Sequence, residues 1–84
     1  MALVAIIEGV RITIYPEDHP PPHFHARFAE FEAKVSIATG EILEGSLPRT
    51  KIAVVMDWYM AHQDEIAYLW REVQMMRSIR RIDR

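Results

Sequence analysis

The sequence feature that most limits the fold is a proline run followed by an alternating segment, within residues 18–28. The three prolines at 20–22 each hold φ near −65° and lack a backbone donor, which predicts an extended arm that is neither helix nor inner strand. Beyond this arm, apolar residues alternate with His23, His25 and Arg27, the pattern of a half-buried strand. Two imidazoles and one guanidinium therefore share one face of the predicted strand.

Size and composition predict one domain over residues 1–84, of which half are hydrophobic. No cysteine is present, which excludes disulfides, thiolate zinc sites and a cysteine nucleophile. The apolar opening at 1–7 has no basic flank and ends at Glu8–Gly9, so it predicts a strand rather than a secretory signal or membrane span. We therefore expect a cytoplasmic protein with no membrane contact.

Residues 1–45 predict a small antiparallel meander sheet of four to five strands. The first predicted strand is an apolar run, and the next three alternate apolar and polar residues. Turn residues such as Glu8–Gly9 and Thr39–Gly40 separate the strands. The predicted strands are residues 3–7, 10–15, 23–28, 31–37 and 41–44. In the second of them, Val10, Ile12 and Ile14 are expected to face inward.

The register of the histidine strand follows from simple antiparallel counting. Pairing Phe28 with Phe31 predicts the polar pairs Arg27 with Glu32, His25 with Lys34, and His23 with Ser36. The first of these is expected to be an ion pair, and the phenylalanines are expected to pack on the opposite face. The connecting Ala29–Glu30 has no Gly or Asn, so a bulge or wider loop is expected there.

Residues 46–77 predict a helical segment that covers one face of the sheet. Its apolar positions recur every three to four residues and form one stripe: Ile52, Val55, Tyr59, His62, Ile66, Leu69, Val73 and Met76. A single helix of about 28 residues would be roughly 40 Å long, so one long helix and two short helices that break near 61–64 both stay open. Residues 78–84 predict a basic tail or a short strand.

The histidine cluster is a candidate metal site. His23 and His25 stand two residues apart on one strand, so their Cα atoms lie roughly 6.5–7 Å apart and both rings can reach one ion. His19 completes the site from the proline segment, and a divalent transition metal suits such ligands. Further candidate ligands are Asp18, Glu30 and His62. The alternative that stays open is a polar surface strip without metal.

A catalytic alternative uses His23, His25 and Arg27 without metal. Arg27 and Lys34 beside His25 would disfavour a further positive charge, so His25 is expected to act as a neutral base. His23 would act as the acid and Arg27 would hold a phosphate, which suits a small ribonuclease. A cross-strand pair with Glu32 would instead neutralise Arg27.

Apolar residues of the helical segment offer surface to a protein partner or a second copy of the chain: Trp58, Met60, Trp70, Met75 and Met76. Trp58, His62 and Trp70 are also spaced as an aromatic ligand wall, although core packing explains the same spacing. At His62 the alternatives are a buried, hydrogen-bonded histidine and a ligand.

The charge is unevenly distributed along the chain. The net charge of −2 argues against a general nucleic-acid binder. From Arg71 onward, five arginines and two acidic residues give +3 and leave −5 for the rest. A contact with nucleic acid or an acidic partner is therefore expected only at this end, through Arg77, Arg80, Arg81 and Arg84, and a solvated tail is the alternative.

Several strings of the chain resemble one family. They are Asp-His-Pro-Pro-Pro-His-Phe-His at 18–25, Phe-Glu-Ala at 31–33, Gly-Glu-Ile-Leu-Glu-Gly at 40–45, Leu-Pro-Arg at 47–49, and Trp58, His62, Glu65 and Trp70. Over nearly its whole length the chain resembles the small prokaryotic proteins known as domain of unknown function 4160. The resemblance implies an α+β bacterial cytoplasmic protein that is often encoded beside another small domain, but it implies no activity.

We therefore expect an α+β fold with the histidine cluster at the proline end of the sheet. The function expected is that of a partner-binding component of a toxin–antitoxin-like or regulatory pair. The alternatives are a small ribonuclease or metal-dependent hydrolase that uses His23 and His25, and a metal-binding protein without catalysis.

Overall fold

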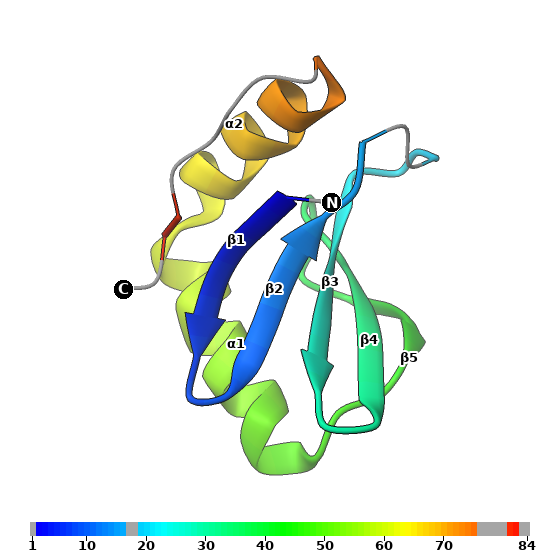
Figure 1. Cartoon of the computed structure of the whole chain (residues 1–84), viewed down its shortest axis with the longest axis vertical. Helices are drawn as coiled ribbons and strands as arrows, with labels where there is room; N and C mark the ends of the chain where they lie inside the picture. The colour runs from blue at the N-terminus through cyan, green and yellow to red at the C-terminus, as the bar shows by residue number, and fades with distance from the viewer. Residues whose placement is uncertain (1, 17–18, 76–80, 83–84) are drawn as a thin grey trace.

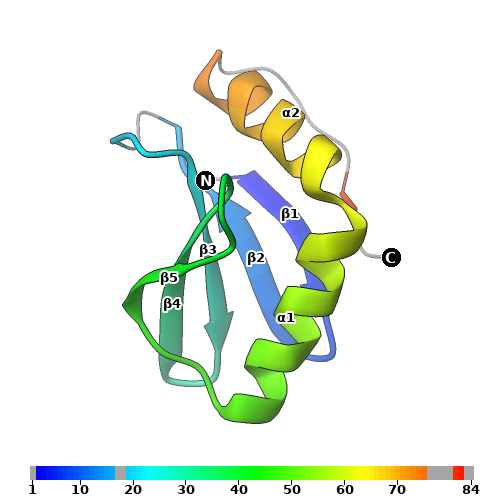
Figure 2. The same cartoon turned by 180° about the vertical axis from the view of Figure 1, so that it is seen from behind.

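The chain forms a five-stranded sheet and two helices, and the computed structural model describes residues 2–16, 19–75 and 81–82. Every strand is antiparallel to its neighbours, and the sheet order follows the chain order. The elements are β1 (Ala2–Ile7), β2 (Val10–Ile14), β3 (His23–Phe28), β4 (Phe31–Ser36), β5 (Ile42–Gly45), α1 (Arg49–Ala61) and α2 (Gln63–Gln74). Helix α1 crosses one face of the sheet, and α2 lies toward the end at which β1 begins (Figures 1 and 2). The predicted α+β meander with C-terminal helices is confirmed.

The first hairpin turns tightly at Glu8–Gly9, between the paired residues Ile7 and Val10. Both turn residues have positive φ, 47° at Glu8 and 82° at Gly9. This combination matches a two-residue turn to the twist of the strands that it joins. The residues of β2 that were predicted to face inward are fully buried: Val10, Ile12 and Ile14.

The second hairpin has the predicted register but not the predicted turn. Phe28 pairs with Phe31, and the polar pairs follow as expected: Arg27 with Glu32, His25 with Lys34, and His23 with Ser36. The expected bulge or wider loop is wrong, because Ala29–Glu30 alone connects the strands. Ala29 adopts a φ of 53°, a left-handed conformation that costs an L residue about 1–2 kcal/mol. Favourable strand pairing outweighs this local cost.

Strand β5 lies close against the backbone of β4. Gly45 has a φ of 76°, and a Cβ atom there would collide with the carbonyl oxygen of Glu32, so only glycine fits. Lys34 pairs with Glu44 whereas Val35 pairs with Ile42, which leaves one extra residue in β5 as a bulge. The edge strand predicted at residues 41–44 therefore forms one residue later, with every residue exposed.

Phe24 of β3 provides the surface on which α1 packs. Its ring is fully buried, with its centroid 5.6 Å from that of Trp58 and 6.3 Å from that of Tyr59. The Tyr59 hydroxyl donates a 2.7 Å hydrogen bond to the carbonyl of Ile37, just beyond β4. Phe31 was expected on this packed face, but it lies at the turn end of the hairpin and is 38% exposed. The core is therefore densest between β3 and α1.

The helical segment forms two short helices that meet at His62. A φ of −131° at this residue interrupts the helix, and its carbonyl accepts the first hydrogen bond of α2, 2.9 Å from the amide of Ile66. A 40 Å helix would exceed the longest dimension of the molecule, 33 Å. The break lets two apolar stripes reach the core: Val55, Trp58 and Tyr59 of α1, and Ile66, Leu69 and Val73 of α2.

Trp58 connects α1 to the end of the described chain. Its Nε1 donates a 2.6 Å hydrogen bond to the carbonyl of Ile82, and the amide of Ile82 donates one of 2.6 Å to Val4 of β1. Trp58 is 4% exposed, so the core interpretation is confirmed and the partner-surface interpretation is wrong for this residue. Of the predicted tail, Arg81 is exposed, whereas 77–80 and 84, like Met76, lie outside the described residues.

The turn at Ala29 generates a stability prediction. Ala29→Gly removes the left-handed strain but adds freedom to the unfolded chain, so we expect a net gain of about 0.5–1 kcal/mol in the free energy of unfolding. The melting temperature should rise by about 2–8 °C in calorimetry. Ala38→Gly, an exposed position outside the positive-φ sites, is the control and should give no gain. An unchanged or lower melting temperature for Ala29→Gly would contradict the strained turn.

Candidate functional site

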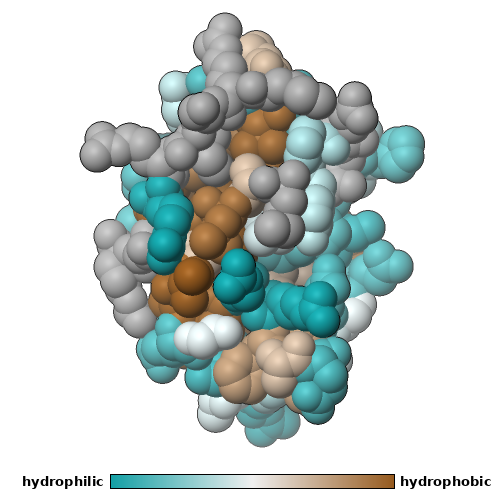
Figure 3. Space-filling model, in the orientation of Figure 1, coloured by the Kyte–Doolittle hydropathy of each residue, from teal (hydrophilic) through white to brown (hydrophobic). Residues whose placement is uncertain are grey.

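Helix α1 leaves one face of the sheet uncovered, and α2 reaches this face only at one end, where Trp70 packs against His23 (Figures 1 and 2). Cross-strand pairing sets its side chains in two rows. The first row crosses all five strands through Leu3, Thr13, His25, Lys34 and Glu44. The second crosses β1 to β4 through Ile6, Arg11, Arg27 and Glu32. We call these two rows the open face. Its surface is apolar over β1 and hydrophilic over β3 and β4 (Figure 3).

The two strand histidines lie side by side, with their ring centroids 5.2 Å apart. Their exposure differs: the His25 side chain is 16% exposed and His23 only 3%. The His23 ring packs 5.5 Å from that of Trp70 on α2, and its Nδ1 donates a 2.7 Å hydrogen bond to the carbonyl of Pro21. His23 is therefore buried, and the alternative of an exposed polar strip is wrong for this residue.

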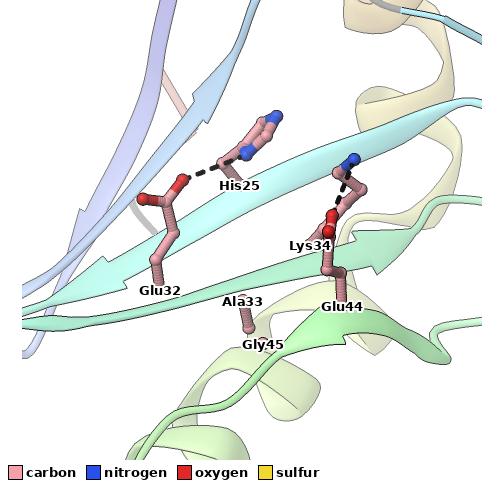
Figure 4. Close-up of a pocket in the computed structure, with 6 residues that line it drawn as sticks. All are labelled: His25, Glu32, Ala33, Lys34, Glu44 and Gly45. Carbon is pink, nitrogen blue, oxygen red and sulfur yellow. Dashed lines mark hydrogen bonds and ion pairs between the residues drawn. The ribbon is translucent and has the colours of Figure 1, made fainter.

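His25 is oriented by a carboxylate. Its Nδ1 donates a hydrogen bond to Oε2 of Glu32, 3.2 Å away, and its second ring nitrogen points away from Glu32 (Figure 4). A carboxylate can only accept, so this contact places the proton of neutral His25 on Nδ1 and the lone pair on Nε2. The ring of Tyr15 packs edge-on at 4.6 Å. An imidazole oriented in this way has the geometry of a general base.

Two hollows meet on the β4–β5 side of the open face, where both are lined by Lys34 and Glu44. One, of about 250 Å³, is completed by His25, Glu32, Ala33 and Gly45 (Figure 4). The other, of about 310 Å³, is completed by His19, Pro20, Pro21, His23 and Leu43. The Lys34 ammonium lies 3.1 Å from the Glu44 carboxylate. Lys34 lies directly opposite His25 as predicted, but its ammonium pairs with Glu44, and His25 contacts the carboxylate of Glu32.

His19 lies near the other histidines only in that it lines the second hollow together with His23. It is exposed, and the proline segment bends at 20–21 instead of forming the expected straight arm; the Pro20–Pro21 peptide is cis. Within 2–16, 19–75 and 81–82, no group of three or more His, Cys, Asp or Glu side chains is placed to hold a metal ion. Asp18 lies outside the described residues, and Glu30 is exposed in the turn after Ala29. Metal binding by His19, His23 and His25 stays a prediction.

Arg27 lies beside the His25–Glu32 pair but takes no part in it. It is exposed on β3, directly opposite Glu32 on one side and Arg11 on the other. In the described part of the chain, Glu32 contacts His25 and forms no ion pair with Arg27. The expected Arg27–Glu32 ion pair is therefore wrong, although the two residues are cross-strand neighbours as predicted.

Sequence reasoning missed two neighbours of the site, Arg11 and Tyr15. Both alternate with the inward-facing residues of the second predicted strand, but the segment at 15–22 that leads to β3 does not by itself set a register. A pairing of Thr13 with His25 is what brings Arg11 opposite Arg27. The signal in the sequence was the shared polar alternation of the two strands, which indicates a common face without saying which residues meet.

The candidate residues of the helices serve other roles. His62 is half-buried at the helix junction, and its Nδ1 lies 2.7 Å from Oε1 of Glu65. This contact favours the hydrogen-bonded interpretation of His62. Trp70 is half-buried against His23, so Trp58, His62 and Trp70 do not line one common hollow among those described. Met60 and Met75 are exposed by 68% and 59%.

Comparison with known proteins identifies the family. The domain of unknown function DUF4160 matches residues 9–71, which include β2 to β5, α1 and most of α2. The chain belongs to this family. No curated protein and no solved structure shows significant similarity to it. Neither helix of this DUF4160 protein, in the part of the chain that is described, has the length and hydrophobicity needed to cross a membrane.

The metal prediction has a direct test. It requires that the purified protein retain about one equivalent of a divalent transition metal after mild dialysis, measured by elemental analysis. His25→Ala should remove that metal, whereas Gln63→Ala, an exposed change on α2, should not. The histidine site would be ruled out if the wild-type protein holds no metal, or if His25→Ala and Gln63→Ala hold equal amounts of it.

Proposed function

We propose that this DUF4160 protein is a partner-binding component of a toxin–antitoxin-like or regulatory pair, and that its partner binds the open face. The observation that carries the proposal is the one-sided covering of the sheet: α1 leaves the open face uncovered, and α2 reaches that side of the sheet only at one end (Figures 1 and 2). The family resemblance, which implies a neighbouring small domain, supplies the candidate partner.

The composition of the open face suits a protein partner. Ile6 is 37% exposed and Leu3 half-buried at the β1 side, where they offer apolar contact area. Arg11 and Arg27 follow on β2 and β3, and carboxylates end both rows on β4 and β5. Apolar contacts supply affinity, whereas alternating bands of charge fix orientation and select the partner. A partner that fits would carry acidic residues opposite the arginines and basic residues opposite the carboxylates.

The partner proposal is tested with the product of the neighbouring gene in titration calorimetry. Ile6→Lys places a charge in the apolar part of the open face, so we expect affinity to fall by at least about tenfold, or roughly 1.4 kcal/mol. Met60→Lys changes an equally apolar side chain on α1, 68% exposed, and should leave affinity unchanged. Circular dichroism checks that both variants fold. Unchanged binding by Ile6→Lys would contradict docking on the open face.

A second function, that of a small ribonuclease, is favoured by one observation. The Glu32 carboxylate lies against His25 and not against Arg27, which orients a base and leaves the adjacent guanidinium charge available for a phosphate. In this proposal His25 is the base and Arg27 holds the scissile phosphate. His23, with Nδ1 bonded to Pro21, would be the acid. A metal-dependent hydrolase would in addition require the metal tested above.

The ribonuclease function can be distinguished from the partner-binding function with one variant and its control. His25→Ala should abolish RNA cleavage or growth arrest, by at least about a hundredfold for a general base. Binding to the neighbouring gene product should be largely retained, because the His25 side chain is only 16% exposed and offers the partner little contact area. Thr39→Ala, an exposed loop change, is the control for growth assays and should have no effect. Equal cleavage by the wild type and His25→Ala would reject the ribonuclease and leave the binding function untouched.

A further inference from the structure

Two arginines lie directly opposite each other on the open face, and neither function proposed above explains why they are paired with each other. Arg11 of β2 and Arg27 of β3 are directly opposite each other in the antiparallel register, and both are exposed. Directly opposite side chains have their Cβ atoms about 4.5–5.5 Å apart, and like charges at this distance destabilise a sheet. The pair therefore has an energetic cost in the isolated protein.

No anion among the described residues relieves that cost. In the described part of the chain, neither guanidinium forms an ion pair or hydrogen bond with another residue. The carboxylate opposite Arg27, that of Glu32, is hydrogen-bonded to His25, and the residue opposite Arg11 is the apolar Ile6. Two directly opposite arginines thus have no counter-charge among the residues that the structure describes.

We propose that Arg11 and Arg27 form a clamp for a single phosphate group. A guanidinium presents its donors in a planar fork that binds oxyanions with two parallel hydrogen bonds, and it keeps its charge. Two forks on neighbouring strands can grip different oxygens of one tetrahedral phosphate, and their combined charge matches a dianion. A planar carboxylate offers only two oxygens and would engage one fork fully.

The charge of the whole chain selects a small ligand over a long nucleic acid. Residues before Arg71 carry a net charge of −5, and carboxylates occupy the β4 and β5 side of the open face. A polyanion crossing this face would meet those carboxylates, whereas one phosphate group at β2 and β3 would not. The ligand class is therefore a phosphate monoester on a small molecule. Binding at this clamp depends neither on the partner nor on catalysis by His25.

Binding is measured by titrating orthophosphate, at constant ionic strength, while recording amide shifts and the melting temperature. We expect saturable shifts centred on residues 11 and 27 and a melting temperature that rises with phosphate. Arg11→Gln and Arg27→Gln should each weaken binding by at least about tenfold, and the double variant should abolish it. Arg71→Gln, on α2, is the matched control and should bind as the wild type does.

A second readout distinguishes a ligand clamp from two ordinary surface arginines. Without phosphate, Arg11→Gln should raise the melting temperature by about 1–5 °C, because it removes a like-charge pair. With saturating phosphate the order should reverse, since the wild type binds phosphate more tightly and gains more stability from it.

Three outcomes would overturn the proposal. The first is phosphate binding that survives in the double variant. The second is equal affinity for succinate, which would show no selectivity for phosphate over carboxylate. The third is binding of a short single-stranded RNA through the two arginines without any binding of orthophosphate, which would assign the pair to nucleic acid. Partner affinity, measured with Ile6→Lys, is a separate quantity, so failure of the clamp and failure of partner docking are distinguishable.

Discussion

The β3–β4 hairpin is the constraint on which the rest of the molecule depends. Its two-residue turn at Ala29–Glu30 sets a register in which His25 lies opposite Lys34. Side chains alternate with a period of two, so a slip of one residue would turn the histidines toward α1 and Phe24 toward solvent. The close approach of Gly45 to the Glu32 carbonyl then positions β5 on the same hairpin. The strained φ of Ala29 is tolerated because both sheet faces require this register.

Aromatic packing makes the molecule one-sided. Phe24 is covered by Trp58 and Tyr59 on one face of the sheet, and Trp58 also holds the carbonyl of Ile82. Because this contact network uses the buried stripes of both helices, in the described residues no helix is left to cover the other face. A chain of 84 residues can build a full core on one side of such a sheet only. The open face is thus a direct consequence of where the aromatic residues stand.

Glu32 decides the electrostatics of the open face. Glu32 lies directly opposite Arg27 and diagonally across from His25, and its carboxylate contacts His25. This choice orients His25 and at the same time leaves Arg27 beside Arg11 without a counter-charge among the described residues. His25, with its tautomer fixed, and Arg27 therefore lie two residues apart along β3, and Arg11 lies opposite Arg27 on β2. The three proposals, for partner binding, acid–base chemistry and phosphate binding, all rest on this one arrangement.

Much of the fold was determined by the sequence alone, because alternation and turn residues act locally. The strands, the Phe28–Phe31 register and the helical stripe all follow from short-range patterns. Tertiary structure alone decided the burial of His23 under Trp70, the break at His62 and the meeting of Arg11 with Arg27. These features join segments that are distant in the chain, and their geometry depends on how layers pack. No local pattern carries that information, because the connection through residues 15–22 permits more than one register between β2 and β3.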